Sequence, residues 1–479
     1  MSHRDRDRVS VSQTNAQGVL VALANLLADV DWKGLRFRQD CRWSRRGLAM
    51  AALLWAWASD RTLTERFTRA LRIMQRLGRS FGPAEASYQG FLELLVRWTA
   101  ELRSCLVSAF QKRMEAEFPY GFRIAGYVVL GGDGSNILLP RTRSNQACYA
   151  PAKTRRKNSR KRSRAGSRAG RPKSRKAREK QSRSKKAESP QMSLAALHHV
   201  GLYMPWDWRL GSSDTSEREH LRSMIASLPP DALLTADCGF VGYEFWSELL
   251  ASKREFVIRV GGNVRLLKQL GVVRESQGTV YLWPDKAAKR RQPPLVLRLV
   301  EVHDGHRSWF LVTSVCDPQR LSDKQVAQIY SSRWRVELLF RDFKQTYGRA
   351  KLRSNKAEHA RCEAEWSLLG LWGMQLYARL QQKTHSQPTT RLSVARVLRA
   401  FGQVIQEFQS RPAPGQSLQE RLVDAVLDTY RRKDKTSRGY PRKKYEPQAK
   451  PPILLTASKM QRQAAKQIIS IPSQKDLTA

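Results

Sequence analysis

The chain has 479 residues, 41% of them hydrophobic, which is enough for two or three domains around a large buried core. Lys and Arg number 86 against 42 Asp and Glu, and a formal charge of +44 repels itself unless a polyanion neutralises it, so nucleic acid is the expected partner. No apolar run approaches the ~20 residues of a spanning helix, no signal peptide is evident and the cysteines stand singly, which excludes membrane proteins, disulfide scaffolds and zinc ribbons and predicts a cytoplasmic protein.

Residues 1–120 are expected to form an all-α N-terminal domain. Apolar residues recur at helical spacing from about Asn15 to Tyr120, and Gly82-Pro83 marks a break between helices. The region carries many arginines, among them Arg36, Arg38, Arg42, Arg45 and Arg46. We expect sequence-dependent DNA binding from this domain; a merely solvated polar face is the alternative.

Residues 121–254 change to the pattern of a mixed α/β sheet. RIAGYVVL and NILL predict short strands on either side of GGDGS, and Leu194 to Arg209 predicts a strand pair. A helix over about 216–228 then precedes the strand Ala232 to Ala236, which ends at Asp237. Strands followed by β-helix-β alternation indicate the first part of an α/β core.

Within this part, residues 153–186 differ in composition from everything around them. Lys and Arg make up 18 of these 34 residues, and Glu179 is the one acid. Such a segment cannot bury enough apolar surface to offset chain entropy, so we expect a disordered basic loop. It suits nonspecific contact with DNA phosphates; a solvated insertion is the alternative.

Three further regions complete the predicted organisation. Residues 255–315 read as a β-rich insertion, with FVIRV, TVYLW, LVLRLVEV and WFLVTSV as strands. Residues 316–383 return to the core, where Ser322 and Gln325 form a capping box that opens a helix. Residues 384–479 are expected to be helical, to end in a loose basic tail after Lys433, and to offer a dimer contact.

The segment YSSRWRVELLFRDFK carries polar residues at a helical spacing that suits catalysis on nucleic acid. Tyr330, Arg333, Glu337 and Lys344 stand at offsets that fall within roughly a 60° arc at about 100° per residue. An acid is thus held among three groups that can contact phosphate. A solvated helix face with ordinary Arg–Glu pairs is the alternative. Asp342 is a rival acid, but it lies about 140° from this face.

Two more carboxylates stand at strand ends upstream. Asp133 lies in GGDGS and Asp237 follows LLTA; the alternatives are a hairpin turn for the first and a strand-end loop acid or a helix cap for the second. We expect the two strands to lie side by side, with Glu337 facing them. Two strand acids and one helix acid suit phosphoryl transfer with two Mg²⁺ or Mn²⁺ ions about 3.5–4 Å apart.

Asp133, Asp237 and Glu337, with the spacing Tyr330-x2-Arg333-x3-Glu337-x6-Lys344, resemble the DDE transposases of bacterial insertion sequences that carry a Tyr-Arg-Glu-Lys signature. The resemblance covers about residues 127–351. It implies an RNase H-like core whose β-rich insertion separates the second Asp from the Glu. The basic segment 153–186 departs from the usual pattern.

The resemblance also implies roles for the remaining site residues. Tyr330, Arg333 and Lys344 would contact the DNA backbone near the cleaved phosphate. Trp309, in the insertion strand SWFLVTSV, resembles the tryptophan that stacks on a flipped base during hairpin formation, although a buried strand Trp is the competing interpretation.

We therefore predict a transposase that moves an insertion sequence by cut-and-paste transposition. The expected partners are double-stranded DNA, as inverted-repeat ends and as target, and a second copy of the chain in a synaptic homodimer beside the bacterial nucleoid. The alternatives are an RNase H-like nuclease that cuts without joining, and a basic DNA-binding protein whose acids are inert.

Overall fold

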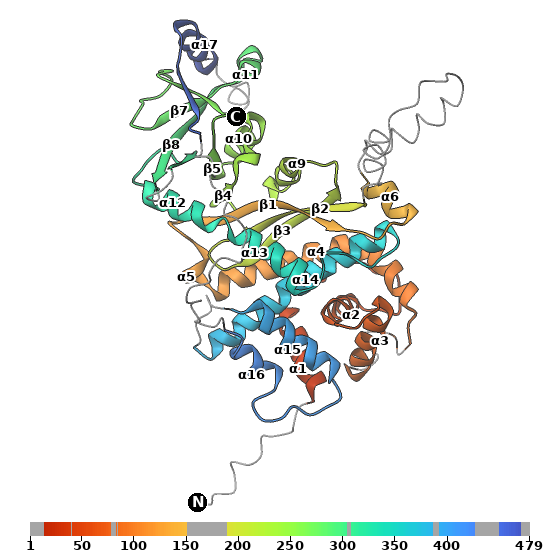
Figure 1. Cartoon of the computed structure of the whole chain (residues 1–479). Helices are drawn as coiled ribbons and strands as arrows, with labels where there is room; N and C mark the ends of the chain where they lie inside the picture. The colour runs from red at the N-terminus through yellow and green to blue at the C-terminus, as the bar shows by residue number, and fades with distance from the viewer. Residues whose placement is uncertain are drawn as a thin grey trace, which may run out of the picture.

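The computed structural model describes residues 14–39, 41–77, 83, 85–150, 189–303, 308–386, 392–426 and 450–470. A single ten-stranded sheet crosses the molecule in Figure 1, with most of the helices gathered against one side of it. The predicted basic loop at 153–186 lies outside the described residues.

Five strands form the centre of the sheet, in the order β3-β2-β1-β4-β5. Their bounds are β1 (Val128–Leu138), β2 (Gln191–His199), β3 (Met204–Ser212), β4 (Ala232–Ala236) and β5 (Glu255–Val260). Strand β2 runs antiparallel to β1 and β3, whereas β4 and β5 run parallel to β1 and to each other. This topology is the predicted RNase H-like mixed sheet.

Strand β1 corrects the prediction of two short strands around GGDGS. It runs without a turn from Val128 to Leu138, and each residue from Leu130 onward has a partner on β2. Asp133-Gly134 is therefore not a hairpin turn, because the antiparallel neighbour β2 pairs continuously through it.

The strands expected in a separate insertion extend the same sheet beyond β5. They are β6 (Arg265–Lys268), β7 (Thr279–Leu282), β8 (Leu295–His303) and β9 (Ser308–Thr313), with the short helix α11 (Asp285–Lys289) after β7. Strand β5, which begins at Glu255, pairs parallel with β4 and antiparallel with β9, so the sheet is continuous across the boundary predicted at residues 254 and 255. The domain boundaries themselves stay predictions.

The C-terminal region is not wholly helical as predicted. Strand β10 (Ile453–Thr456) pairs parallel with β6 at the edge of the sheet, and helix α17 (Lys459–Ser470) follows it. The apolar run Ile453 to Leu455 gives this segment strand character, which the surrounding Pro and Lys residues masked in the sequence.

Helices cover both faces of the central strands. Figure 1 shows α9 (Glu217–Arg222) and α10 (Tyr243–Ala251) on one side, and α13 (Arg335–Arg341), α14 (Ala357–Thr384) and the N-terminal helices on the other. The N-terminal helices are α1 (Asn15–Leu26), α2 (Arg45–Trp57), α3 (Leu63–Met74), α4 (Tyr88–Glu117) and α5 (Pro119–Phe122). The remaining helices include α6 (Arg143–Tyr149), α12 (Asp323–Ser332), α15 (Val394–Gln406) and α16 (Leu418–Val423).

A buried ionic cluster fastens the N-terminal helices and α14 to the sheet. Arg103 on α4 ion-pairs with Asp207 on β3, and its Nε lies 3.1 Å from Oε2 of Glu365 on α14. The indole of Trp208 donates to the same Glu365 oxygen over 2.6 Å, and the Arg103 guanidinium stacks 4.6 Å from that ring. These contacts fix the positions of α4, β3 and α14 relative to one another, although the three elements are distant in the sequence.

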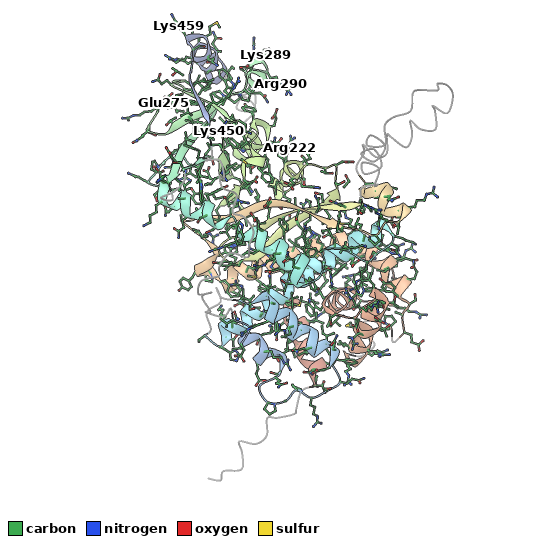
Figure 2. All side chains as sticks on the ribbon, viewed as in Figure 1. Arg222, Glu275, Lys289, Arg290, Lys450 and Lys459 are labelled. Carbon is green, nitrogen blue, oxygen red and sulfur yellow. The ribbon has the colours of Figure 1, made fainter. Side chains whose placement is uncertain are left out.

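The edge of the sheet at β10 carries exposed basic side chains. Figure 2 labels Lys289, Arg290, Lys450 and Lys459 around β10 and α17, and all four are exposed. Among the described residues, no helix is both long enough and apolar enough to span a bilayer.

Candidate active site

The site lies at the carboxyl end of β4, where β1 continues without β4 beside it. Strand β4 pairs with β1 as far as Gly131 and Thr235, whereas β2 accompanies β1 on to Leu138. On the β4 side, the next residues of β1 therefore have no neighbouring strand, and we call this gap in the pairing the crevice. Crevices beyond the carboxyl ends of parallel strands are the usual ligand sites of α/β sheets.

Both predicted aspartates border this crevice. Asp133 lies on β1 two residues beyond the last pairing with β4, and its Oδ1 accepts from the N–H of Gly134 over 2.8 Å. Asp237 directly follows β4, and its Oδ1 accepts from the N–H of Gly239 over 2.8 Å, capping the short helix Cys238–Phe240. Asp237 is thus a cap, as the alternative interpretation held.

The segment from Tyr330 to Lys344 is not the regular helix that was predicted. Helix α12 begins at the predicted capping box of Ser322 and Gln325, but it ends at Ser332. The N–H groups of Arg333 and Glu337 bond to carbonyls three residues back, and a π-helix from Asp342 to Thr346 follows α13. The 60° arc therefore does not describe the segment, because both the tightened turn and the wide turn change its angular spacing.

The irregular segment nevertheless directs its polar side chains at β1. The Arg333 guanidinium lies 3.4 Å from Oδ2 of Asp133 and 3.3 Å from Oε1 of Glu337, so it bridges the two acids. Lys344 Nζ donates to Ser135 Oγ over 2.5 Å. Asp342 takes no part in this arrangement; its carboxylate pairs with Arg341 at 3.2 Å.

The charges of the site residues shift one another's pKa values. Burial raises the pKa of Asp133, and the charges of Asp237 and Glu337 raise it further, against the opposing effects of Gly134 N–H and Arg333. For Arg333, burial alone lowers the pKa, but Tyr330 and the three acids together hold it above its ordinary value. Burial also lowers the pKa of Lys344. The structure therefore brings Asp133, Glu337 and Arg333 into contact, places Lys344 at Ser135 two residues along β1, and leaves Asp237 near enough for its charge to raise the pKa of Asp133.

Tyr330 and Trp309 lie at the border between this site and the insertion strands. Their rings meet edge to face with centroids 6.3 Å apart, and the Arg333 guanidinium lies 5.8 Å from the Tyr330 ring. Tyr330 is 7% exposed, whereas Trp309 is only partly buried. Tyr330 thus offers little free surface, while part of the Trp309 ring stays accessible beside it.

Three residues near the crevice were missed from the sequence. Ser135 accepts a hydrogen bond from Lys344. Burial raises the pKa of Tyr330, and the charges of Arg333 and then of Arg259 on β5 oppose this rise. Glu217 at the start of α9 has its pKa raised by partial burial and then by the charges of Asp133 and Asp237. No sequence signal marked Glu217, because an acid just after Ser216 reads as an ordinary first-turn residue.

The donor set suits divalent cations, but the acids are not arranged around a common point. Carboxylate oxygens are the preferred ligands of Mg²⁺ and Mn²⁺. Within the described residues, no three acids, histidines or cysteines lie close enough together to hold an ion. Arg333 occupies the position between Asp133 and Glu337, so ion binding requires these side chains to rearrange.

A family model and a curated relative each match part of this chain. Residues 134–372 match a family model described as a transposase DDE domain, which begins one residue after Asp133 and includes Asp237 and Glu337. The transposase InsG for insertion sequence element IS4 of Escherichia coli strain K12 is 26% identical over 207 residues, covering 41% of this chain. The match spans 46% of that relative, or about half its length.

A solved structure is similar in outline alone. A chain from a cryo-EM structure of a piggyBac transposase synaptic complex with hairpin DNA aligns over 86% of each chain, with a TM-score of 0.38 and 10% identity. A likeness of this degree carries no argument about the present site.

Proposed function

Because this chain is a member of the DDE transposases, we propose that it catalyses cut-and-paste transposition of an insertion sequence. The observation that carries the proposal is the meeting of Asp133, Glu337 and Arg333 at the crevice that Asp237 borders. The reaction would hydrolyse a phosphodiester at each element end and then join the freed 3′-hydroxyl to target DNA.

Divalent metal ions are the general cofactors of this family. Asp133, Asp237 and Glu337 would hold two Mg²⁺ or Mn²⁺ ions, which activate the attacking oxygen and stabilise the leaving oxygen when bound. The charges of Asp237 and Glu337 both raise the pKa of Asp133, and bound cations would offset this repulsion.

The cationic side chains would position the scissile phosphate. The planar guanidinium of Arg333 matches the geometry of phosphate oxygens. Arg333 would be free to bind a phosphate once cations replace it as the partner of Asp133 and Glu337. Lys344 would supply a point charge beside Ser135. The Tyr330 ring contacts the Arg333 guanidinium, and Trp309 would stack on an extruded base from the insertion side.

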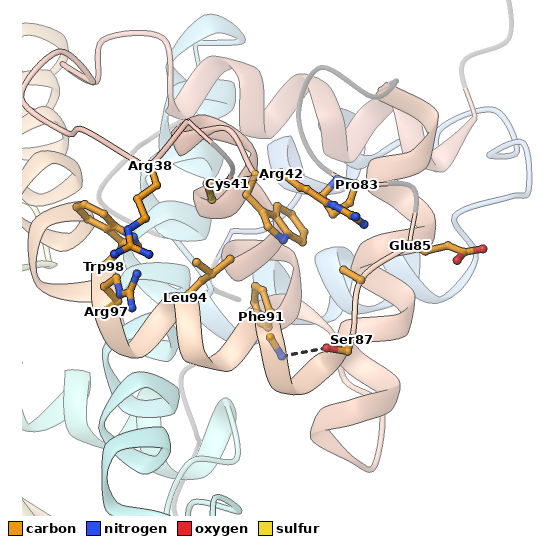
Figure 3. Close-up of a pocket in the computed structure, with 13 residues that line it drawn as sticks. Arg38, Cys41, Arg42, Pro83, Glu85, Ser87, Phe91, Leu94, Arg97 and Trp98 are labelled. Atoms are coloured by element: carbon orange, nitrogen blue, oxygen red, sulfur yellow. Dashed lines mark hydrogen bonds between the residues drawn. The ribbon is translucent and has the colours of Figure 1, made fainter.

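A pocket in the N-terminal helices supports DNA-end binding there. It has a volume of about 450 Å³ between α4 and the segment before α2, and Arg38, Arg42 and Arg97 line it. Figure 3 shows Arg38 and Arg97 gathered beside the Trp98 ring, while Glu85 points away from them. Arginines around an aromatic surface suit a phosphate backbone and its bases.

The basic segment 153–186 is proposed to add nonspecific affinity for DNA. Its 18 Lys and Arg residues would release counterions from the phosphate backbone on binding. Deleting it should weaken DNA binding at low salt and flatten the dependence of affinity on salt, while cleavage at saturating protein persists. An unchanged salt dependence would exclude the contact.

The proposal places two copies of the chain on two DNA ends, beside the nucleoid of a bacterial cell. Light scattering of the chain with and without end DNA tests the synaptic homodimer. We expect a complex that contains two protein chains; one chain per duplex at saturation would rule the dimer out.

The direct test uses purified full-length chain, Mg²⁺ and a duplex carrying the inverted repeats expected to flank the coding region. We expect cleaved ends and products joined to a target plasmid. Asp133→Ala, Asp237→Ala and Glu337→Ala should each abolish cleavage while retaining end binding. Cutting without joining would indicate a nuclease, and DNA binding without any metal-dependent cutting would indicate a binding protein with inert acids.

A further inference from the structure

We propose that Tyr347 and Arg349 are positioning residues of the transposase reaction. They fasten the chain just after Lys344 to the end of helix α2, and in this way they set the ammonium group of Lys344 against β1. The inference rests on the proposed function, in which Lys344 binds the scissile phosphate. It adds two residues that no sequence pattern marked.

Both side chains bind the carbonyl oxygen of Ala56, in the last turn of α2. The Tyr347 hydroxyl donates to this oxygen, and Arg349 Nη2 donates to it over 3.0 Å. Helix α2 ends at Trp57, so the carbonyl is one of the last four, which have no partner inside the helix. Ala56 is 2% exposed, so its carbonyl depends on these two donors rather than on bulk water.

The guanidinium of Arg349 is held by α14 and by Tyr347 as well as by α2. Its Nε donates to Ser367 Oγ on α14 over 3.0 Å, and its Nη1 donates to the Tyr347 carbonyl over 3.2 Å. The guanidinium also lies 4.2 Å from the Tyr347 ring. Burial raises the pKa of Tyr347, against the opposing charges of Arg349 and Arg66, so the hydroxyl stays protonated and can donate at neutral pH.

The anchor point on α2 is itself fixed to α14. Trp57 Nε1 donates to the carbonyl of Gly370 over 2.9 Å. A Cβ placed on Gly370 would lie 3.1 Å from the Cβ of Ala56, so the two helices approach closely at this point. The Ala56 carbonyl is therefore a fixed point against which the chain after Lys344 can be positioned.

A closed set of hydrogen bonds connects this anchor with Lys344. The N–H of Ala350, next to Arg349, donates to the carbonyl of Lys344 over 3.1 Å. The carbonyl of Ala350 accepts from the N–H of Leu138 on β1 over 3.0 Å, and Lys344 Nζ donates to Ser135 on the same strand. The backbone and the side chain of Lys344 are thus both tied to β1, and their geometry depends on how Arg349 is held.

The wide turn that contains Lys344 also depends on the contact with α2. Asp342–Thr346 is a π-helix, and the N–H of Tyr347 donates to the carbonyl of Asp342, five residues back, over 2.8 Å. Such turns are rare and occur frequently at functional sites. Relaxation to an α-helical bond would turn the Tyr347 side chain by about 100° about the helix axis, away from Ala56. The contact with Ala56 therefore opposes a relaxation that would redirect Lys344.

The first test measures strand cleavage by the full-length chain with Mg²⁺, with protein in excess over end DNA so that one turnover is observed. Tyr347→Phe removes only the hydroxyl donor, and Arg349→Met removes the guanidinium while keeping most of the length. We expect each to lower the cleavage rate about 10- to 100-fold, since a misplacement of about 1 Å has effects of this size, with the Kd for end DNA changed less than about twofold. Arg399→Met, an exposed arginine on α15, and Tyr120→Phe, an exposed ring, are the matched controls.

A double-mutant cycle with Lys344→Met distinguishes positioning from general damage to the fold. If Arg349 acts through Lys344, Arg349→Met should change the already lowered rate of Lys344→Met by less than about twofold. Arg349→Lys keeps a positive donor and should recover part of the rate. Equal fold losses in both backgrounds would overturn the inference, and so would wild-type rates in both Tyr347→Phe and Arg349→Met.

A second measurement needs neither DNA nor metal. Competitive acetylation followed by mass spectrometry reports how accessible the Lys344 amine is, because partial burial and the hydrogen bond to Ser135 protect it. Ser135→Ala removes that partner and gives the reactivity of a released amine. We expect Tyr347→Phe and Arg349→Met to raise the reactivity of Lys344 about fivefold, the effect of losing one ordinary hydrogen bond, while Arg399→Met leaves it unchanged.

The two measurements separate this inference from the proposed function. A protected Lys344 in Tyr347→Phe and Arg349→Met, with a reactive Lys344 in Ser135→Ala, would refute the positioning role and leave the proposed function standing. A reactive Lys344 in both variants, with no metal-dependent cleavage by the wild-type chain, would instead refute the proposed function and with it any catalytic role of the contact.

Discussion

The guanidinium of Arg333 lies 3.4 Å from the carboxylate of Asp133, and it bridges this acid to Glu337 at 3.3 Å. A cationic side chain therefore occupies the position that a metal ion would need between two acids. The bridge keeps two carboxylates together before cations bind, and it ties the broken helix segment to β1.

Arg333→Ala should destabilise the metal-free chain by about 1–3 kcal/mol, since it leaves two neighbouring carboxylates without a partner. Saturating Mn²⁺ should recover most of this loss, because cations bind the native state and take over the compensation. Urea denaturation with and without Mn²⁺ measures both effects. Lys324→Ala, an exposed residue on α12, is the control, and an equal loss in both conditions would contradict the replacement of Arg333 by cations.

The raised pKa of Asp133 predicts how stability depends on pH. As the pH rises above the ordinary value of 3.8, the unfolded chain releases this proton first, so ionisation of Asp133 lowers the free energy of unfolding through that window. Asp133→Asn removes the loss of unfolding free energy that ionisation of this carboxyl group causes. Without divalent ions, the variant should melt above wild type at pH 7, and its advantage should vanish toward pH 3. A lower melting temperature at pH 7 would mean that the Arg333 contact outweighs burial.

The sequence predicted the end of β4 and the start of α12 better than it predicted the backbone between the elements. Asp237 was placed correctly because LLTA is an apolar strand with an abrupt end, and the capping box at Ser322 was confirmed. The path through GGDGS was wrong because Asp-Gly is a strong turn signal, and only the pairing with β2 and the approach of α9 show why glycine is needed there.

Long-range packing explains what the sequence could not show. The break after Ser332 and the π-helix beginning at Asp342 occur inside a good helical pattern, where β1 lies directly beneath: a Cβ on Gly131 would lie 3.6 Å from the Arg333 carbonyl. Glu217 has no local motif, and its relevance arises only when α9 folds onto β1. Strand β5 looked like part of an insertion because its position beside β4 depends on the sheet order.

The buried cluster around Glu365 predicts a stability effect far from the catalytic crevice. Glu365→Ala leaves Arg103 and the indole of Trp208 without their shared acceptor, so we expect a loss of about 2–4 kcal/mol in the free energy of unfolding. Glu358→Ala, an exposed acid in the first turn of the same helix, should change little. Urea denaturation measures both, and similar small effects would show that the cluster contributes no net stability.

Trp309 offers a test of base extrusion that separates stacking from packing. Loss of a stacked base costs about 1–3 kcal/mol, so Trp309→Ala should weaken capture of an extruded base by roughly 5- to 150-fold, while Trp309→Phe should keep most of it. A 2-aminopurine placed at the flanking position of the DNA end reports capture by fluorescence quenching. Trp334 is 55% exposed beside Arg333, so Trp334→Ala is the informative comparison. If Trp334→Ala removed the quenching and Trp309→Ala did not, the stacking role would belong to the helix break, and Trp309 would serve only to pack against Tyr330.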